Sequence, residues 1–406
     1  MRILFLNPVG TLGGAERSLL ELLAVLAGER PEWKLSLITG DEGPLVQAAL
    51  DQGAEVEVLP LPGGIKSLGD SGILGARGVW RLSTMGLSFP SKFLGLWAYI
   101  RKLRQRIEYF QPDVIHSNGF KFHVILGLLG KVLPKTVWHA RDFVSTRKMV
   151  GKILRNFCQM PDIVVANSRA VALDWDNSIP GVAKKVLYNS VSIPELDGVA
   201  ETTFTLCGGP NPGCAMRVGL VASYAKWKGH HVFLEAVRTL APLFSPSSVQ
   251  FYVVGGPLYA TGGSQWTRAE LEDLAGTLGI LDRVIFLPHQ TDVDIVYRGL
   301  DIIVHASTKP EPFGRTIVEG MAYGKAVVAA LDGGVGEIID HGKDSLAFHP
   351  GNHDDLAQKL TMVLQNHELR VRLGFFGRRK ALDHFSRKAL KGNVVSLFET
   401  LLGAGL

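Results

Sequence analysis

Residues 301–322 have the sequence DIIVHASTKPEPFGRTIVEGMA, and this stretch decides how the chain is organised. Its apolar start, Ile302–His305, predicts a buried strand, and the residues after Gly314 open a helix. Pro312 and Gly314 form the turn between them. A strand followed by a tight turn and a helix is the unit from which parallel sheets are built, so we expect a parallel sheet here.

The same alternation of short β-branched runs and helical patterns continues on both sides of this stretch. In the first half the predicted strands are Ile3–Leu6, Leu35–Thr39, Val56–Leu61, Val114–Ser117, Thr136–His139, Ile163–Asn167 and Lys185–Tyr188. In the second half they are Arg217–Ala222, Gln250–Val254, Val284–Leu287, Ile302–His305, Val327–Leu331 and Leu346–Phe348. We therefore expect an α/β protein with two Rossmann-like, doubly wound parallel-sheet domains that face a central cleft.

The domain boundary follows from composition. The Gly/Pro cluster Cys207–Gly213 cannot hold regular structure and predicts a linker over residues 195–216. This linker separates an N-terminal domain, residues 1–194, from a C-terminal domain, residues 217–385. A chain of 406 residues with 46% hydrophobic side chains is long enough for two such cores.

The turn before the helix has the chemistry of an anion site. The N–H groups of Gly314, Arg315 and Thr316 would face outward at the positive end of the helix dipole. Glu311 precedes the turn and Glu319 follows about two helical turns later, so hydroxyl groups on both sides of a phosphate would find an acceptor. This arrangement suits a nucleotide sugar. The simpler alternative is a strand-to-helix turn in which Glu319 is a solvated helix residue.

Two further segments fit a phosphate ligand. Lys228 follows the strand Arg217–Ala222 and would project a cation that neutralises a diphosphate, although a surface lysine is the simpler interpretation. Glycines follow the first strand at Gly10, Gly13 and Gly14, which permits close backbone approach, but their spacing is not that of a dinucleotide fingerprint.

Together these residues resemble the retaining glycosyltransferase family 4 (glycosyl transferases group 1) of bacterial polysaccharide biosynthesis, which has the GT-B fold. The resemblance covers nearly the whole chain. The matching motifs are Gly13-Gly14-Ala15-Glu16, Trp138–Asp142, Asn167-Ser168, Lys228-Gly229, the pair Glu311/Glu319, Asp332–Ile339 and Phe385-Ser386. The most specific of them is the E-x₇-E block with Pro-Phe-Gly inside it, followed by Gly-Gly-x-x-Glu.

The resemblance implies a role for each motif residue. Its implied catalytic residues are Glu311, His139 and Lys228. Its implied donor-binding residues are Gly14, Ser223, Lys228, His289, Glu311, Gly314, Arg315, Thr316 and Glu319. Within this set Glu311 would touch the donor sugar and Glu319 the ribose, while Glu16 would contact the acceptor. The N-terminal domain would then bind the acceptor, with the last helix, residues 386–406, packed back on it.

The chain departs from the family pattern at two places. Ser223 stands where the family usually has an arginine as a second cation for the diphosphate, and Lys226 is a candidate substitute. Tyr188-Asn189-Ser190 stands where Pro-Asn-Gly is common.

The expected function is retaining, metal-independent transfer of a hexose from UDP-glucose or another UDP-sugar to a polysaccharide or lipid-linked glycan. No metal or other cofactor is expected. Two D-x-D sequences, Asp174–Asp176 and Asp292–Asp294, resemble the metal motif of another transferase architecture, but Asp292 is better explained as a helix N-cap. The alternatives are a sugar-nucleotide epimerase of the same fold and a non-catalytic protein that binds sugar nucleotides.

Positive charge is concentrated in one segment. Residues 60–155 hold 16 Lys and Arg against four Asp and Glu, whereas the whole chain has a net charge of +5. No strand is predicted over residues 62–106, where basic residues alternate with Trp, Phe and Leu. This pattern favours contact of residues 66–106 with an anionic membrane. The alternatives are that this segment binds a polyanionic carbohydrate or that it is an ordinary solvent-exposed surface. Binding of nucleic acid is not expected, because the sequence has no recognised nucleic-acid-binding module beside the charge.

The cysteine count bears on the compartment. Three cysteines in a long chain are typical of a reducing environment, although Cys207 and Cys214 are close enough in sequence to bridge. We expect a cytoplasmic protein, with a peripheral position on the inner face of the plasma membrane as the membrane-bound form.

Overall fold

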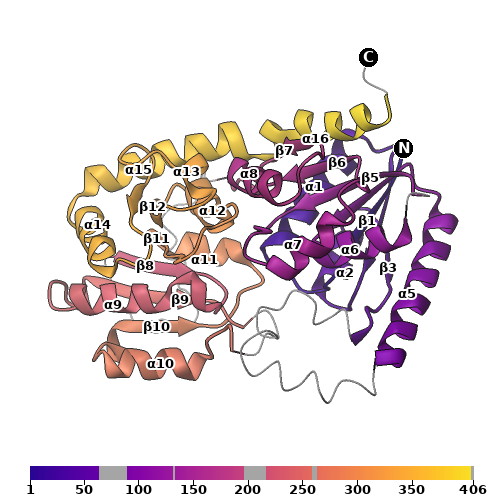
Figure 1. The fold of residues 1–406 in the computed structure, drawn as a ribbon. Helices are drawn as coiled ribbons and strands as arrows, with labels where there is room; N and C mark the ends of the chain where they lie inside the picture. Colours follow the sequence, from indigo (N-terminus) through magenta and orange to yellow (C-terminus); the bar gives the residue numbers. More distant parts are fainter. Residues whose placement is uncertain (64–88, 131–132, 196–215, 258–262, 404–406) are drawn as a thin grey trace. The chain divides into compact units, whose positions relative to one another are not determined.

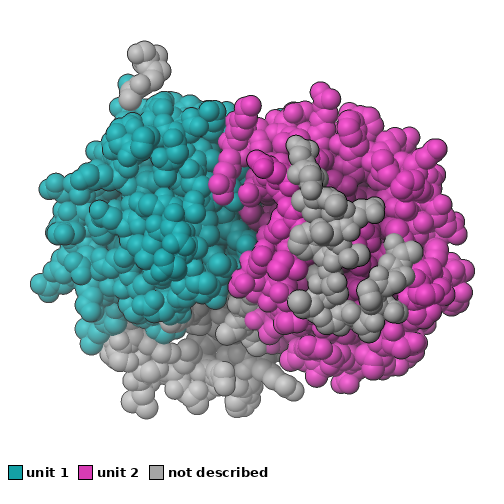
Figure 2. Space-filling view, turned by 180° about the vertical axis from the view of Figure 1, so that it is seen from behind, with its two compact units in different colours: residues 1–190, 390–406 teal, residues 191–389 magenta. Residues whose placement is uncertain are grey.

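The structure is a computed structural model, and it describes residues 1–63, 89–130, 133–195, 216–257 and 263–403. The chain divides into two compact units, residues 1–190 with 390–406 and residues 191–389 (Figure 2). The predicted linker, residues 195–216, lies almost entirely outside the described residues, and so do Cys207 and Cys214.

The first unit is built on a seven-stranded parallel sheet of order β3-β2-β1-β4-β5-β6-β7 (Figure 1). Its strands are β1 (Arg2–Asn7), β2 (Lys34–Thr39), β3 (Glu55–Val58), β4 (Val114–Asn118), β5 (Lys135–Ala140), β6 (Ile163–Ala166) and β7 (Lys184–Val186). Its helices are α1 (Gly14–Glu29), α2 (Pro44–Leu50), α5 (Phe89–Phe110), α6 (Phe120–Leu129), α7 (Lys148–Arg155), α8 (Arg169–Ser178) and α16 (Arg387–Leu401).

Alternation of side chains along the strands builds a core on each face of this sheet. Leu4 and Leu6 of β1 belong to a core that includes residues of α5, α6 and α8. Ile3 and Phe5 point to the opposite face, into a core with α1, α2 and α16. Residues 390–401 of α16 therefore complete the first unit, although residues 191–389 separate them from the rest of that unit.

The second unit has a six-stranded parallel sheet of order β10-β9-β8-β11-β12-β13. Its strands are β8 (Met216–Val221), β9 (Val249–Val254), β10 (Val284–Leu287), β11 (Ile302–His305), β12 (Ala326–Ala330) and β13 (Leu346–Phe348). Its α-helices are α9 (His230–Leu240), α10 (Arg268–Thr277), α11 (Val293–Gly299), α12 (Arg315–Ala322), α13 (Val335–Ile338), α14 (His353–Gln365) and α15 (His367–Lys380). Short 3₁₀ turns, η1 (Lys226–Lys228) and η2 (Leu281–Arg283), and a π turn, η3 (Ala381–Phe385), complete it.

The predicted α/β class and the predicted strands are confirmed, with strand ends displaced by at most three residues. The residues between the first two predicted strands form α1. Ser386 accepts a hydrogen bond from the amide of Ala389 at 3.0 Å, so it caps α16. The sequence did not predict α5. This helix includes the C-terminal part of residues 62–106, the segment in which no strand is expected.

Strand order locates the ligand-binding edges. In each sheet the order reverses beside the first strand, between β1 and β4 in one unit and between β8 and β11 in the other. Loops that leave neighbouring strands in opposite directions open a crevice at the carboxyl ends of the strands, where ligands of doubly wound sheets bind. The residues that follow β1, β4, β8 and β11 are therefore the candidates for function.

Candidate active site

Glu311 is the centre of a polar cluster at the reversal point of the second sheet. It follows β11, and its Oε2 accepts hydrogen bonds from Lys228 Nζ at 2.6 Å and from Ser307 Oγ at 2.9 Å. His305 Nε2 lies 3.0 Å from the same oxygen. Lys228 is 83 positions earlier in the chain, at the end of η1, and reaches Glu311 because β8 and β11 are neighbours.

This cluster keeps the Glu311 carboxyl ionised. Burial alone would raise its pKa, but the charge of Lys228 and the hydrogen bond to His305 outweigh burial and hold the pKa well below its usual range. The side chains of Glu311 and Lys228 are 10% and 20% exposed, so their attraction is only partly screened by water.

The backbone around Glu311 depends on the glycines of the Asp332–Ile339 motif. Gly333 has φ +63°, and a Cβ there would lie 2.5 Å from the carbonyl oxygen of Glu311. The amide of Gly334 donates to that oxygen at 2.7 Å. The Asp332–Ile339 motif therefore fixes the backbone position of Glu311, the central residue of the polar cluster.

The helix α12 begins at Arg315, directly after the turn. Gly314 is its N-cap with φ +95°, a conformation that favours glycine. Among the described residues no side chain caps this end. The helix start thus has the uncapped backbone geometry that a phosphate group requires.

Glu319 lies one turn further along α12 and is held through both oxygens. Tyr297 OH donates to Oε2 at 2.6 Å, and Arg315 Nε donates to Oε1 at 2.7 Å. Tyr297 is itself buried and stacks on Tyr323, with ring centroids 5.3 Å apart. Glu319 is a buried, bonded group and not the solvated residue of the simpler alternative.

The other predicted donor residues lie on loops at the same edge. Ser223 is partly buried two residues after β8, and His289 is exposed two residues after β10. The backbone of His289 lies beside Gly256, which follows β9. Lys226, the candidate substitute for the missing arginine, is exposed and has its Nζ 4.9 Å from the centre of the Trp266 ring.

In the first unit, Gly14 and Glu16 form the start of α1, next to the end of β1. Glu16 Oε2 accepts the amide of Gly13 at 3.1 Å, so this carboxylate satisfies the N-cap amide of its own helix. Its other oxygen lies 3.5 Å from Asn7 Nδ2, and burial raises its pKa. Glu16 is 4% exposed, so in this structure it stabilises the helix start.

His139 is the next-to-last residue of β5 and is buried. Its Nδ1 lies 3.1 Å from Nε2 of His116 on β4, while its Nε2 makes no hydrogen bond to any residue that the structure describes. Burial lowers the pKa of both imidazoles, to about 3 for His116. His139 is thus a neutral imidazole with a hydrogen bond on one side only. His116 lies in the middle of β4, and His123 lies on α6.

A chain of amide groups connects the ends of β1 and β4, and the sequence did not predict it. Asn118 Nδ2 donates to Asn7 Oδ1 at 2.6 Å, and Asn118 Oδ1 accepts from Nε of Arg141. Arg141 also donates to Asn189 Oδ1 at 2.8 Å. Their positions in the sequence could have suggested this contact. Asn7 and Asn118 are the last residues of two strands that flank the reversal point.

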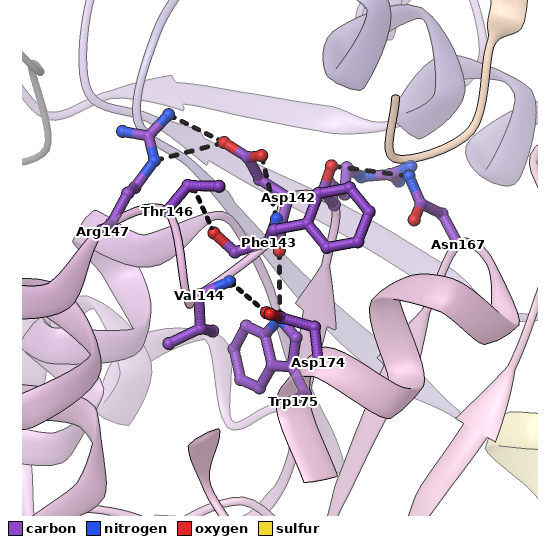
Figure 3. A network of polar contacts seen from close by, with 9 residues as sticks. Asp142, Phe143, Val144, Thr146, Arg147, Asn167, Asp174 and Trp175 are labelled. Atoms are coloured by element: carbon purple, nitrogen blue, oxygen red, sulfur yellow. Dashed lines mark hydrogen bonds and ion pairs between the residues drawn. The ribbon is translucent and has the colours of Figure 1, made fainter. Parts of the chain in front are cut away.

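The loop after β5 is braced by several contacts (Figure 3). Asp174 Oδ2 accepts the amides of Val144 at 2.6 Å and Ser145 at 3.2 Å. Asp142 pairs with Arg147 at 2.8 Å, and its carbonyl accepts Trp175 Nε1 at 3.1 Å. The brace fixes the loop that follows His139 and Arg141.

These contacts also explain the two D-x-D sequences. Asp174 braces a loop and Asp176 pairs with Lys184 at 2.7 Å. Asp292 caps α11 by accepting the amide of Asp294 at 2.9 Å, which confirms the prediction for Asp292. Within the described part of the chain, no three His, Cys, Asp or Glu side chains are grouped as a metal site would require. Nor does any described helix have the length and apolarity needed to cross a bilayer.

Two family models match this chain. The model described as Glycosyltransferase Family 4 matches residues 12–193, and the one described as Glycosyl transferases group 1 matches residues 216–380. The first match covers strands β2 to β7, the second covers strands β8 to β13, and together they span most of the chain.

The chain belongs to glycosyltransferase family 4.

The chain is related to several curated proteins at modest identity. The lipopolysaccharide core biosynthesis glycosyltransferase LpsD of Rhizobium meliloti is 25% identical over 358 residues, 87% of this chain and 92% of LpsD. The D-inositol 3-phosphate glycosyltransferase of Corynebacterium urealyticum is 28% identical over 193 residues, 47% of this chain. That match spans only 44% of the relative, and two other relatives match over 36% and 38% of their length.

The fold of family 4 is also found in solved structures. Anabaena Alr3699/HepE in complex with UDP and glucose superimposes with a TM-score of 0.79 at 23% identity, covering 98% of this chain and 100% of that one. Sucrose-phosphate synthase from Thermosynechococcus elongatus has a TM-score of 0.76 at 16% identity and covers both chains fully. These likenesses establish the GT-B fold.

Proposed function

We propose that this protein is a retaining hexosyltransferase that uses a nucleotide sugar, UDP-glucose or another UDP-sugar, and transfers the hexose to a polysaccharide or lipid-linked glycan. The observation that carries the proposal is the Lys228–Glu311 pair beside the uncapped start of α12. It places a cation, a carboxylate and helix-start amides at the reversal point of one sheet. A diphosphate linked to a sugar needs these groups together.

In the proposed reaction the bond between the anomeric carbon and the diphosphate breaks. Negative charge develops on the departing diphosphate, and the amides of Gly314, Arg315 and Thr316 together with Lys228 stabilise it. The acceptor hydroxyl attacks from the side that the diphosphate leaves and passes its proton to a departing phosphate oxygen. Configuration is then retained without a protein nucleophile and without a metal.

The remaining predicted residues orient the sugars. Glu311, held ionised by Lys228, accepts hydrogen bonds from hydroxyls of the donor hexose. We assign His139 to the donor sugar, since this neutral imidazole has a second nitrogen without a hydrogen bond to the described residues. Glu16 contacts the acceptor, which requires that its carboxylate leave the amide of Gly13 at the start of α1.

The comparisons support the donor and acceptor classes of this proposal. Alr3699/HepE was crystallised in complex with UDP-glucose and has the same fold over nearly the whole chain. LpsD, which matches over most of its length, is named for lipopolysaccharide core biosynthesis. A UDP-sugar donor and a glycan acceptor are therefore the first substrates to test.

A thermal-shift panel of UDP-, GDP- and ADP-sugars tests the donor. We expect a UDP-sugar to raise the melting temperature, and NAD to have no effect. Transfer is then measured for Glu311→Ala, Lys228→Ala and the control Lys380→Ala. Lys380 is also an ion-paired lysine, 17% exposed, and lies outside the cluster.

The outcomes separate the alternatives. Loss of transfer in both cluster variants, with the fold and the control activity intact, supports the proposal, whereas full transfer in both would overturn it. Conversion of the donor sugar without an acceptor would indicate an epimerase. A thermal shift with neither transfer nor donor hydrolysis would indicate a binding protein.

The proposal includes a peripheral membrane contact, for which only the α5 part of residues 66–106 is described. Leu94 and Trp97 are 68% and 55% exposed near the start of α5, and Arg101 and Lys102 are exposed one turn later. Apolar anchors beside basic groups fit an anionic lipid surface.

Sedimentation with phosphatidylglycerol vesicles tests this contact. We expect binding that phosphatidylcholine vesicles do not give and that weakens with salt. At about 1 kcal/mol for each basic residue, Arg101→Glu with Lys102→Glu should weaken binding by about 30-fold or more. The control Arg387→Glu with Lys388→Glu alters two exposed basic residues of α16. Equal binding of all variants would contradict the contact.

A further inference from the structure

Arg315 and Glu319 form a buried ion pair on α12 within the proposed donor site. Their side chains are 14% and 9% exposed, and the Nε to Oε1 distance is 2.7 Å. Tyr297 holds the other carboxylate oxygen at 2.6 Å. The guanidinium is thus shielded from water and lies on the helix whose first amides face the proposed diphosphate.

A ribose that binds Glu319 has to share Oε1 with the Arg315 guanidinium. A carboxylate has about four acceptor positions on its two oxygens, and Arg315 and Tyr297 each use one. Two ribose hydroxyls directed at the carboxylate would meet Arg315 at Oε1. Binding is easiest when the guanidinium moves to another anion, since it keeps its charge in any buried setting.

The diphosphate is that other anion. Arg315 is the first residue of α12, so its backbone lies at the phosphate end of the helix and its side chain at the ribose end. Phosphate oxygens form short, charge-assisted bonds with guanidinium groups, and a diphosphate has more negative charge than one carboxylate.

Other cations near this edge are less well placed for a second contact. Position 223 is a serine, and the exposed Lys226 lies against the Trp266 ring. Lys228 is the cation already proposed for the diphosphate, and it is bonded to Glu311.

We propose that Arg315 is the second cation for the donor diphosphate, and that its transfer from Glu319 to the phosphates leaves Glu319 Oε1 to the ribose alone. This inference rests on the proposed function. It makes the two ends of the nucleotide bind cooperatively, because the phosphates remove the group that competes with the ribose. Couplings between sites are typically about 5- to 150-fold in affinity.

Calorimetry with uridine and UDP tests the coupling in the wild type, Arg315→Met, Arg315→Lys and Lys226→Met. Arg268→Met is a matched control, because Arg268 opens α10 and pairs with Glu272 at the same i, i+4 spacing and the same 2.7 Å. If the donor panel selects another base, its nucleoside and diphosphate replace uridine and UDP. Melting curves without ligand establish that each variant is folded.

We expect Arg315→Met to bind UDP at least tenfold more weakly and uridine as well as or better than the wild type. Arg315→Lys should keep part of the UDP affinity, and Arg268→Met and Lys226→Met should match the wild type. The inference is overturned if Arg315→Met binds UDP normally, if it loses uridine and UDP equally, or if Lys226→Met shows the selective loss. Failure of the wild type to bind any nucleoside diphosphate would instead overturn the proposed function.

Discussion

Lys228 is the partner that makes a buried charge at Glu311 tolerable. Replacing it with methionine leaves the carboxylate bonded only to Ser307 and His305 among the described residues. Loss of one member of a buried pair is costly, so we predict that Lys228→Met lowers the free energy of unfolding by about 3 kcal/mol in urea titrations.

A double variant separates stability from function. Lys228→Met with Glu311→Gln removes the orphaned charge and should recover most of the lost stability, yet it should not recover transfer. Recovery of transfer in this double variant would show that neither charge takes part in the reaction.

Gly229 is fixed by its surroundings as well as by its backbone angle. Its φ is +74°, and a Cβ there would lie 1.8 Å from the carbonyl oxygen of Ala306. We predict that Gly229→Ala lowers the free energy of unfolding by about 3 kcal/mol, because strain and overlap add. Gly342→Ala is the control, since Gly342 has φ +79° with nothing within 4 Å, and it should lose only about 1 kcal/mol. Equal losses at both positions would show that the overlap is relieved at no cost.

At the level of elements, the loop after β5 depends on Asp174 (Figure 3). We predict that Asp174→Ala lowers the free energy of unfolding by about 2 kcal/mol, because two backbone amides lose a charged acceptor. Asp176→Ala should change it by at most about 1 kcal/mol, since Asp176 is 58% exposed in its pair with Lys184. Urea denaturation of the two variants measures the difference, and a larger loss for Asp176→Ala would refute the brace.

The elements could be predicted from the sequence to very different degrees. Buried strands such as Ile302–His305 are continuous apolar runs, and the local pattern identifies them. The helix α5 was missed because Gly and Pro interrupt the segment before it, and Pro90 is tolerated only because it falls in the first turn. Glu311, Lys228 and Glu319 could be proposed from motifs, whereas their partners Ser307, His305 and Tyr297 depend on strand order and on packing that local sequence does not encode.

Across the whole molecule, buried neutral histidines determine the response to acid. Burial lowers the pKa of His116, His123 and His230 to about 3 and that of His139 well below its usual value. In the unfolded chain these groups take up protons below about pH 6.5, while the folded protein does not. Stability should therefore fall as pH drops below 6.5, by at most about 1.4 kcal/mol per pH unit for each histidine, until the folded groups titrate near pH 3.

Carboxyl groups do not cancel this trend between pH 6.5 and 4.5. The raised pKa of Glu16 acts in the opposite direction, and the lowered pKa of Glu311 adds to the loss only near pH 4.5 and below. Urea midpoints at pH 7.5, 6.0 and 5.0 measure the effect. His230→Phe removes one titrating group that has no hydrogen bond to the described residues, so it should flatten the slope by about a quarter. An unchanged midpoint from pH 7.5 to 5.0 would contradict the prediction.

The position of α16 has a consequence for how the chain folds during synthesis. Val394, Leu397 and Phe398 complete a core of the first unit, yet all of residues 191–389 are translated before them. At roughly 5 to 20 residues per second, the ribosome takes about 10 to 40 s over that interval. The second unit can therefore fold as it emerges, while the nascent first unit lacks Phe398, the ring that contacts Phe5 and Trp33 in the folded protein.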